Sequence, residues 1–135
     1  MSLTAFQTDK ILHNAYNLLS REKNTINDLN VFPVPDGDTG LNMTLTIQTA
    51  LNSLKKKDIE TLCIREYLMN FANGMILNSR GCSGVILALF CKGIAESVKQ
   101  SDHLNNISNS ELSAAFRLGY ELAYKETPSP CEGTM

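Results

Sequence analysis

Residues 30–40 read N-V-F-P-V-P-D-G-D-T-G, and this stretch interrupts a chain whose other segments mostly carry helical patterns. Pro33 and Pro35 fix their own backbone angles and push the residues before them toward extended conformations. Gly37 and Gly40 allow unusual backbone angles and close approach of other groups. The stretch is therefore predicted to be a stiff, extended loop that holds its two aspartates at fixed positions.

The carboxylates of this loop belong to Asp36 and Asp38. Hard cations such as Mg²⁺ prefer oxygen ligands, and they take few of them from protein when phosphate and water supply the rest. A helix is expected to begin near Thr39 or Gly40, where unpaired amides and the positive end of the helix dipole suit phosphate oxygens. The loop therefore predicts a site for a metal–nucleotide complex.

An ordinary turn with an aspartate N-cap is the alternative interpretation of this loop, because Asp and Gly are common turn residues. The apolar lead-in V-F-P-V at 31–34 is unusual for such a turn and favours the binding site. A calcium-binding EF-hand is excluded, because Leu41 and Ile47 stand where that pattern needs a glycine and an acidic residue. The sequence also contains no Walker A phosphate-binding pattern.

A second break in the helical pattern, N-S-R-G-C-S-G-V-I-L at 78–87, places G-x-x-G directly before the most apolar segment. Small residues there let backbone amides approach an anion, and Ser83 adds a hydroxyl. The alternative is a plain turn between helices, with Gly81 as C-cap and Ser83 as N-cap. Arg80 is expected to meet either phosphate or a surface carboxylate. Cys82 is interpreted as a small packing residue rather than a reactive thiol.

Apolar residues recur every three or four positions through the rest of the chain, which is typical of amphipathic helices. The predicted helices cover 4–22, 40–56, 58–77, 82–99 and 110–126. Ser110 is predicted to be an N-cap, after a surface loop at 101–110. The helix at 82–99 is apolar on nearly all sides at its start, so we expect it to be packed from several directions. No segment alternates as a strand does, and the predicted fold class is therefore all-α, an antiparallel helix bundle within a single domain.

Composition argues against several classes of function. The formal net charge is -2, which gives no electrostatic footprint for nucleic acid. We expect no membrane span, and the first residues lack the regions of a signal peptide, so a cytoplasmic protein is expected. The 4 cysteines have no C-x-x-C spacing and fit neither a zinc site nor a disulfide framework. His13 and His103 stand alone, so a histidine-based catalytic triad has no support.

Three motifs carry a resemblance to a known family: N-V-F-P-V-P-D-G-D-T-G-x-N-M from Asn30, R-G-x-S-G-V-I-L from Arg80, and the final E-G-T-M. Nearly the whole chain resembles the nucleotide-binding domain of the dihydroxyacetone-kinase family, and within that family the N-terminal domain of bacterial fatty acid kinase. The resemblance implies an eight-helix antiparallel barrel. It also implies that ATP binds at one end, with two Mg²⁺ ions between the acidic loop and the phosphates.

The resemblance further assigns roles to single residues. Asp36 and Asp38 match metal ligands, and Asn30 lies near the place of a third metal-binding aspartate. Met135 matches a methionine beside the adenine. Together with it, the residues that match nucleotide-binding positions are Thr39, Gly40, Leu41, Asn42, Gly81, Cys82 and Ser83.

The activity implied by the resemblance is transfer of the γ-phosphate of ATP to the carboxylate of a fatty acid, which a separate acyl-binding protein presents. No general base is needed for this transfer, because a carboxylate is already a nucleophile. Transfer to dihydroxyacetone and a non-catalytic nucleotide-binding or interaction module are the alternatives. The family domain continues beyond E-G-T-M. We therefore expect an incomplete domain with exposed apolar faces, homo-oligomers and weak nucleotide binding by this chain alone.

Overall fold

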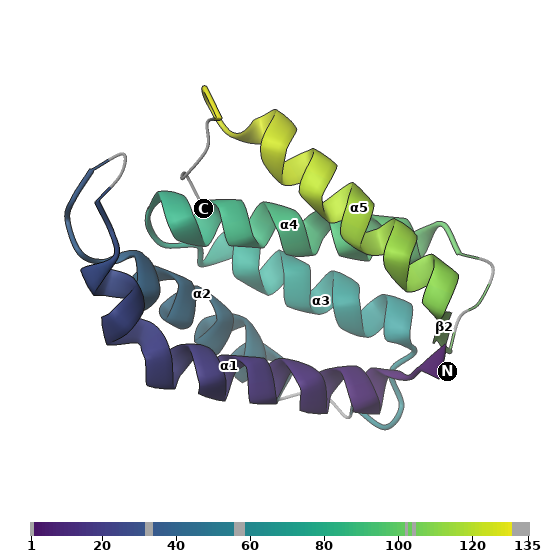
Figure 1. Cartoon of the computed structure of the whole chain (residues 1–135). Helices are drawn as coiled ribbons and strands as arrows, with labels where there is room; N and C mark the ends of the chain where they lie inside the picture. The colour runs from purple at the N-terminus through teal and green to yellow at the C-terminus, as the bar shows by residue number, and fades with distance from the viewer. Residues whose placement is uncertain (1, 32–33, 56–58, 102, 104, 131–135) are drawn as a thin grey trace.

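The computed structural model describes residues 2–31, 34–55, 59–101, 103 and 105–130 of the chain. The described part is helical apart from two very short strands (Figure 1). In chain order the elements are β1 (Ser2–Leu3), α1 (Ala5–Asp28), α2 (Thr39–Leu54), α3 (Ile64–Leu77), α4 (Gly81–Lys99), β2 (Ile107–Ser108) and α5 (Asn109–Glu126). The predicted all-α fold class is confirmed.

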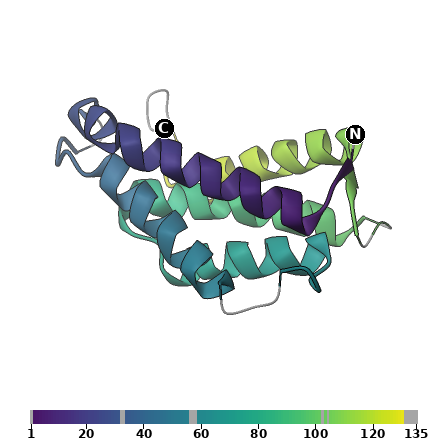
Figure 2. The same cartoon turned by 90° about the horizontal axis from the view of Figure 1, so that it is seen from below.

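Successive helices run antiparallel to one another (Figure 1). The three helices α2, α3 and α4 all pack against each other, while α1 packs on α2 and α3, and α5 packs on α4. Seen from below, α1 lies nearest to the viewer and runs along most of the molecule (Figure 2). This up-and-down order brings the N-termini of α2 and α4 to the same end as the loop between α1 and α2.

The core is formed by apolar side chains of the helices and by close helix crossings. Leu54, Ile64 and Met75 are fully buried between the central helices. The crossing of α4 and α5 depends on two glycines, because a Cβ atom on Gly93 would lie 2.6 Å from the Cα of Gly119. At this distance a side chain would force the two helices apart, so the crossing fixes α5 against α4.

The helix bounds differ from the sequence prediction most at the end of α1 and the start of α3. Helix α1 continues to Asp28 rather than ending at 22, and α3 begins at Ile64 rather than at 58. Cys63 is the N-cap of α3, because its sulfur accepts a hydrogen bond from the Glu66 amide. The N-cap of α5 is Ser108 and not Ser110 (Asn109 is already helical).

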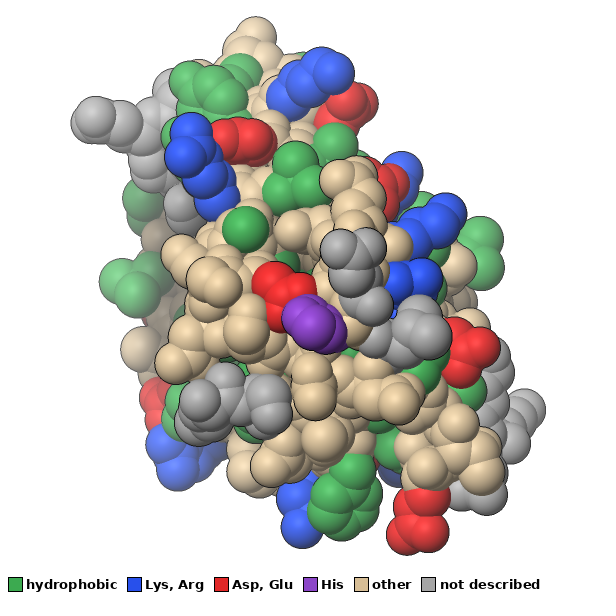
Figure 3. All heavy atoms as spheres, turned by 90° about the vertical axis from the view of Figure 1, so that its right-hand side faces the viewer, with side chains coloured by type: hydrophobic (Ala, Val, Ile, Leu, Met, Phe, Trp, Pro, Cys, Tyr) green, Lys and Arg blue, Asp and Glu red, His purple; other side chains and the backbone are tan. Residues whose placement is uncertain are grey.

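The segment 101–110 was predicted to be a surface loop, and this prediction is wrong at its end. Ile107 is buried, and it pairs with Leu3 in the antiparallel contact of β2 with β1. The strand pair ties the starts of α1 and α5 together at the end opposite the aspartate loop. Figure 3 views that end, where acidic and basic side chains are scattered without forming a patch of one sign.

Several apolar side chains are less buried than the sequence pattern predicted. The apolar face of α5 contains small and aromatic residues. Its small residues Ala115, Gly119 and Ala123 are buried. Its aromatic residues Phe116, Tyr120 and Tyr124 are 51%, 60% and 54% exposed. On α4, Ala88 is buried while Val85 is 42% exposed. The expectation that α4 is packed from several directions therefore holds for only part of its surface.

Helix α4 also corrects the expectation that no segment could span a membrane. By length and composition alone it is long and apolar enough, with a mean hydropathy of 1.5. This is weak support for a span, because a helix at the centre of a bundle has the same composition. In the described structure α4 packs against α2, α3 and α5.

Candidate functional site

The two motifs that interrupt the helical pattern meet at one end of the bundle (Figure 1). The aspartate loop leads into the first turn of α2, and the glycine turn leads into the first turn of α4. The Ser83 hydroxyl donates a hydrogen bond of 3.4 Å to the Thr39 carbonyl oxygen. Residues about forty positions apart in sequence are thus joined directly.

A buried threonine fixes the spacing between these two helix starts. Thr46 is 0% exposed, and its hydroxyl donates to the Asn42 carbonyl oxygen at 2.7 Å. The same hydroxyl oxygen accepts a hydrogen bond of 3.1 Å from the Arg80 amide, directly before α4. A Cβ atom on Gly84 would lie 2.5 Å from this oxygen, so only glycine lets α4 approach so closely.

Gly81, the first residue of α4, is a second position at this helix start that requires glycine. Gly81 has a φ of 59°, in the left-handed region that residues with a Cβ atom rarely adopt. A Cβ atom there would also lie 2.3 Å from the Asn42 side-chain nitrogen. The Asn42 amide group therefore lies between the first turns of the two helices, where a donor could meet an anion bound to both.

The segment is a short turn between α3 and α4, but the cap positions of the predicted turn are wrong. The C-cap of α3 is Asn78 and the N-cap position of α4 is Arg80, whereas Gly81 and Ser83 both lie in the first turn of α4. Cys82 is exposed in that turn, which contradicts its interpretation as a packing residue. The Arg80 side chain is also exposed and makes no ion pair with the described residues, so no surface carboxylate among them is its partner.

The N-termini of α2 and α4 differ from those of the other three helices. Helices α1, α3 and α5 each begin with a reciprocal capping box, in which side chains at the N-cap and third positions bond the backbone amides. The N-cap residues of α2 and α4, Asp38 and Arg80, make no side-chain capping hydrogen bond. The amides of Thr39, Gly40, Cys82 and Ser83 have no acceptor among the described residues.

The carboxylates of the aspartate loop are equally without partners. Asp36 is exposed and Asp38 is half-buried, and neither side chain makes a hydrogen bond or ion pair with the described residues. The turn interpretation included an aspartate N-cap, but Asp38, the N-cap residue of α2, forms no side-chain capping hydrogen bond. Gly37 has a φ of 66° and turns the chain between the two aspartates.

The end of α1 supports both the loop and α2. Gly40 lies against α1 so closely that a Cβ atom there would be 2.3 Å from the Lys23 carbonyl oxygen. The Asn27 side-chain oxygen accepts a hydrogen bond of 3.1 Å from the Leu41 amide. Asn30 bonds the loop twice, accepting from the Asp38 amide at 3.3 Å and donating to the Val34 carbonyl oxygen at 2.9 Å.

The structure therefore gathers most of the residues that the sequence singled out. Brought together at one end are Asn30, Asp36, Asp38, Thr39, Gly40, Leu41, Asn42, Gly81, Cys82 and Ser83. Met135 lies outside the described residues. Sequence reasoning missed Asn27 and Thr46. Asn27 was missed because the helix was predicted to end at 22, and Thr46 because a threonine inside a helix has no special sequence signal.

The composition of the site limits how it could hold a metal. Within the described residues, no group of three or more His, Cys, Asp or Glu side chains could bind an ion. Two carboxylates without partners in the described part of the chain fit Mg²⁺, which commonly takes only one or two carboxylates and fills its other positions with phosphate and water. They do not fit a closed structural zinc site, which needs four protein ligands.

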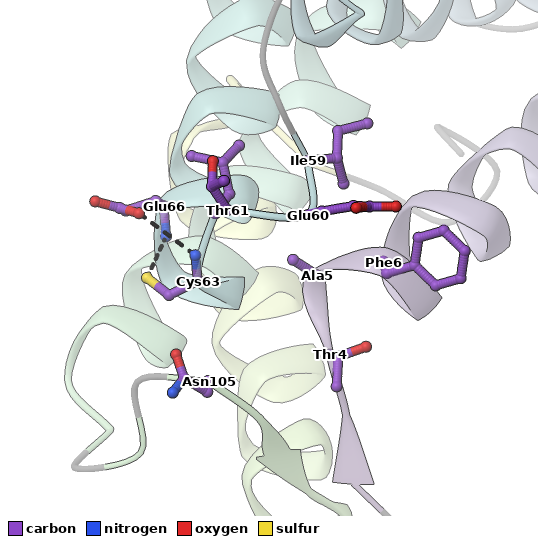
Figure 4. Close-up of a pocket in the computed structure, with 10 residues that line it drawn as sticks. Thr4, Ala5, Phe6, Ile59, Glu60, Thr61, Cys63, Glu66 and Asn105 are labelled. Atoms are coloured by element: carbon purple, nitrogen blue, oxygen red, sulfur yellow. Dashed lines mark hydrogen bonds between the residues drawn. The ribbon is translucent and has the colours of Figure 1, made fainter.

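A hollow of about 400 Å³ lies at the opposite end of the molecule (Figure 4). Its lining includes Thr4, Cys63, Glu66 and Asn105, and the dashed lines in Figure 4 mark the capping box of α3. Three cysteines, at 63, 82 and 91, are free among the described residues, and burial raises the pKa of the Cys91 thiol to about 12. Neither the hollow nor Cys91 contributes a group to the site formed by α2 and α4.

Comparisons with known proteins identify the family. The sequence profile of the DAK2 domain matches residues 33–135. An uncharacterised protein of Mycoplasma genitalium is 40% identical over 121 residues, which cover 88% of this chain and 22% of that protein. Uncharacterised proteins of Staphylococcus haemolyticus and Staphylococcus aureus are 36% and 35% identical over 127 residues, covering 94% of this chain and 22% of each protein.

The chain thus spans about a fifth of the length of the relatives that it matches. The profile covers the aspartate loop from residue 33 onward and the whole glycine turn. The chain belongs to the DAK2 domain family of nucleotide-binding, kinase-related domains.

Proposed function

We propose that this end of the bundle binds the phosphates of a magnesium–ATP complex and positions the γ-phosphate for transfer. The observation that carries the proposal is the pair of neighbouring helix starts without side-chain caps, next to two carboxylates that have no partner among the described residues. The other three helices have capping boxes, so capping is the usual way in which this chain satisfies its helix ends. Phosphate oxygens would satisfy the free amides instead.

The signs of the charges explain why a cation would be needed. Asp36 and Asp38 would repel phosphate at short range if no cation lay between them. Bound Mg²⁺ would neutralise phosphate charge and bridge the phosphate oxygens to the loop. The carboxylates of Asp36 and Asp38 would hold the ion, while the first turns of α2 and α4 would orient the phosphates through their backbone amides.

Arg80 fits the same ligand. A cation beside the positive end of a helix dipole is unfavourable unless an anion lies near it. The Arg80 side chain has no ionic partner among the described residues. We therefore include Arg80 as a residue that contacts phosphate, in addition to the amides of Cys82 and Ser83.

The acceptor proposed for the γ-phosphate is a fatty acid carboxylate presented by a separate acyl-binding protein. A carboxylate oxygen would form the new bond to phosphorus while the bond from phosphorus to the β,γ-bridging oxygen breaks, which yields an acyl phosphate and ADP. This acceptor carries no proton to remove, which agrees with a site whose side chains offer positioning and charge rather than a general base. The apolar lead-in at 31–34 supports this acceptor through its resemblance to fatty acid kinase.

The binding half of the proposal is tested by calorimetry of ATP with the full chain, with and without Mg²⁺. Asp36→Asn and Asp38→Asn should weaken Mg²⁺-dependent binding by more than the roughly 10–100-fold that loss of an outer-shell partner of a metal site costs. Thermal stability should not fall, since two neighbouring carboxylates repel each other when no cation is bound. Unchanged affinity in both variants would exclude the metal site.

A matched control removes the same charge far from the site. Glu96 lies in the C-terminal half of α4, and among the described residues its one ion pair is with Lys92, at 3.8 Å. It is fifteen residues beyond Gly81, about 22 Å along the helix. Glu96→Gln should therefore leave the affinity for ATP and its dependence on Mg²⁺ unchanged.

The acceptor half is tested separately by following phosphate transfer from labelled ATP. A fatty acid loaded on an acyl-binding protein and free dihydroxyacetone are offered in parallel, in the presence of Mg²⁺. Transfer to the fatty acid alone supports the proposal, and transfer to dihydroxyacetone replaces it with the other branch. Tight binding without transfer to either acceptor would indicate a non-catalytic module.

Sedimentation of the same sample tests whether the exposed aromatic side chains of α5 lead to self-association.

A further inference from the structure

Two asparagines at the end of α1 hold the aspartate loop and the start of α2. Asn27 lies in the last turn of α1, and Asn30 follows two residues after the helix ends. Between them they make three hydrogen bonds to backbone groups of the segment 34–41. No other described side chain makes a hydrogen bond to the backbone of this segment before α2 begins.

Asn30 makes two bonds that require both a donor and an acceptor, and its amide side chain supplies one of each. Its oxygen accepts from the Asp38 amide at 3.3 Å, and its nitrogen donates to the Val34 carbonyl oxygen at 2.9 Å. The two partners fix the orientation of the group, since a carbonyl oxygen can only accept and a backbone amide can only donate. An aspartate at this position could accept from Asp38 but would face the Val34 carbonyl oxygen with a second acceptor.

Asn27 provides the acceptor that the N-cap of α2 does not. The Asp38 side chain makes no capping bond, and the Leu41 amide is instead satisfied by the Asn27 oxygen at 3.1 Å. One free amide of the helix start is thus occupied from α1, while those of Thr39 and Gly40 stay available. The distribution of free amides at this helix end is set by the last turn of α1.

We propose that Asn27 and Asn30 are positioning residues, and that Asn30 acts on a bound metal through the backbone of Asp38 rather than as an oxygen ligand. This inference rests on the proposed function. It replaces the role of third metal ligand that the sequence resemblance gave to Asn30. By bonding both the Val34 carbonyl oxygen and the Asp38 amide, Asn30 holds the two ends of the segment 34–38 in place. The position of the Asp38 carboxylate, and so its distance from a bound ion, depends on these two hydrogen bonds.

Asn30→Asp separates the two roles, because they predict opposite results. A ligand would gain charge and bind Mg²⁺ more tightly. A positioning residue would lose its donor to Val34, and Mg²⁺–ATP affinity would fall by about fivefold to tenfold, the loss expected for one net hydrogen bond. Affinity for ATP without metal should not change, whereas a general loss of fold would weaken both. Asn24→Asp, at an exposed position one turn earlier in α1, controls for the added charge and should change affinity less than about twofold.

Several results would overturn the inference. Equal or tighter binding of Mg²⁺–ATP by Asn30→Asp would make Asn30 a ligand, and a parallel loss of metal-free binding would make it merely structural. If that variant does not fold, hydrogen exchange on the wild-type chain decides, because the Asp38 and Leu41 amides must be protected without any ligand. Wild-type binding of ATP that ignores Mg²⁺ is a different failure, since it would reject the proposed function itself.

Discussion

Replacing Thr46 by valine tests whether one buried hydroxyl holds the two helix starts in place. Valine has nearly the same shape but cannot accept the 3.1 Å hydrogen bond from the Arg80 amide. A donor left without an acceptor costs about 1–3 kcal/mol, and we take about 2 kcal/mol because this amide is only partly buried. For a chain of this length, that loss corresponds to a melting temperature about 7 °C lower.

The assay combines thermal unfolding with ATP calorimetry, and Thr46→Ser is the matched control. Serine keeps the hydroxyl and loses one buried methyl group, at a cost of about 1 kcal/mol. We expect Thr46→Val to weaken Mg²⁺–ATP binding about tenfold, equivalent to 1.4 kcal/mol, because α4 moves relative to α2. Thr46→Ser should bind as the wild type does. Equal stability of the two variants, or full affinity in Thr46→Val, would refute the reasoning.

Three further substitutions test other parts of the structure. Gly81→Ala should lower the free energy of unfolding by about 1–2 kcal/mol, because alanine is strained at the positive φ of this position. It should also weaken ATP binding, because the added Cβ atom would meet the Asn42 side chain. Calorimetry at a temperature where the variant is fully folded measures this second effect. Gly93→Ala should lower the melting temperature, since its Cβ atom would lie 2.6 Å from the backbone of α5, but should leave ATP affinity unchanged in the folded fraction. The pKa of Glu111 is lowered to about 2 by hydrogen bonds, first from Ser101 and then from the N-cap serine of α5. Its carboxylate therefore adds stability above the unfolded pKa of 4.5 that is lost as the pH falls toward 2, and an acid titration of unfolding should show a smaller loss for Glu111→Gln than for the wild type.

The starts of α2 and α4 could be predicted within one residue because their signals are local. Prolines and glycines leave no freedom for a regular helix across 30–40 and 78–81, so the breaks are visible in the sequence. The same local logic predicted that phosphate-binding amides and carboxylates would be neighbours. Short connections make successive helices antiparallel, so the starts of α2 and α4 lie at the same end of the bundle.

Other helix ends could not be predicted because tertiary contacts decide them. The segment 21–28 has little apolar periodicity, and α1 continues through it because Lys23 and Asn27 pack and bond against α2. The start of α3 was misplaced because cysteine is not a preferred N-cap, although Cys63 forms a capping box here. In α5 the glutamate at 111 selects Ser108 over Ser110 as the cap.

Amphipathic patterns predict which face of a helix is apolar, but not which of its side chains are covered. On α5 the close crossing with α4 buries only small residues, such as Ala115 and Gly119. The large aromatic side chains on the edge of that face remain about half exposed, with Phe116 touching Phe90 edge to face at 5.7 Å between ring centres. The helical period was read correctly, while burial depended on the crossing geometry.

The site keeps groups of both signs without partners, and this has a consequence for binding order. On the proposed function, phosphate alone would meet two carboxylates that repel it, and Mg²⁺ alone would find only two protein oxygens of strong affinity. Each ligand removes the obstacle for the other, so their binding is coupled. Because coupling is reciprocal, Mg²⁺ must raise the affinity for ATP by the same factor by which ATP raises the affinity for Mg²⁺. The neutral variants Asp36→Asn and Asp38→Asn should shrink both factors together, since they remove the repulsion along with the ligand. A site that binds the metal and the nucleotide more tightly together than apart needs no further side chain to favour the complex over its parts.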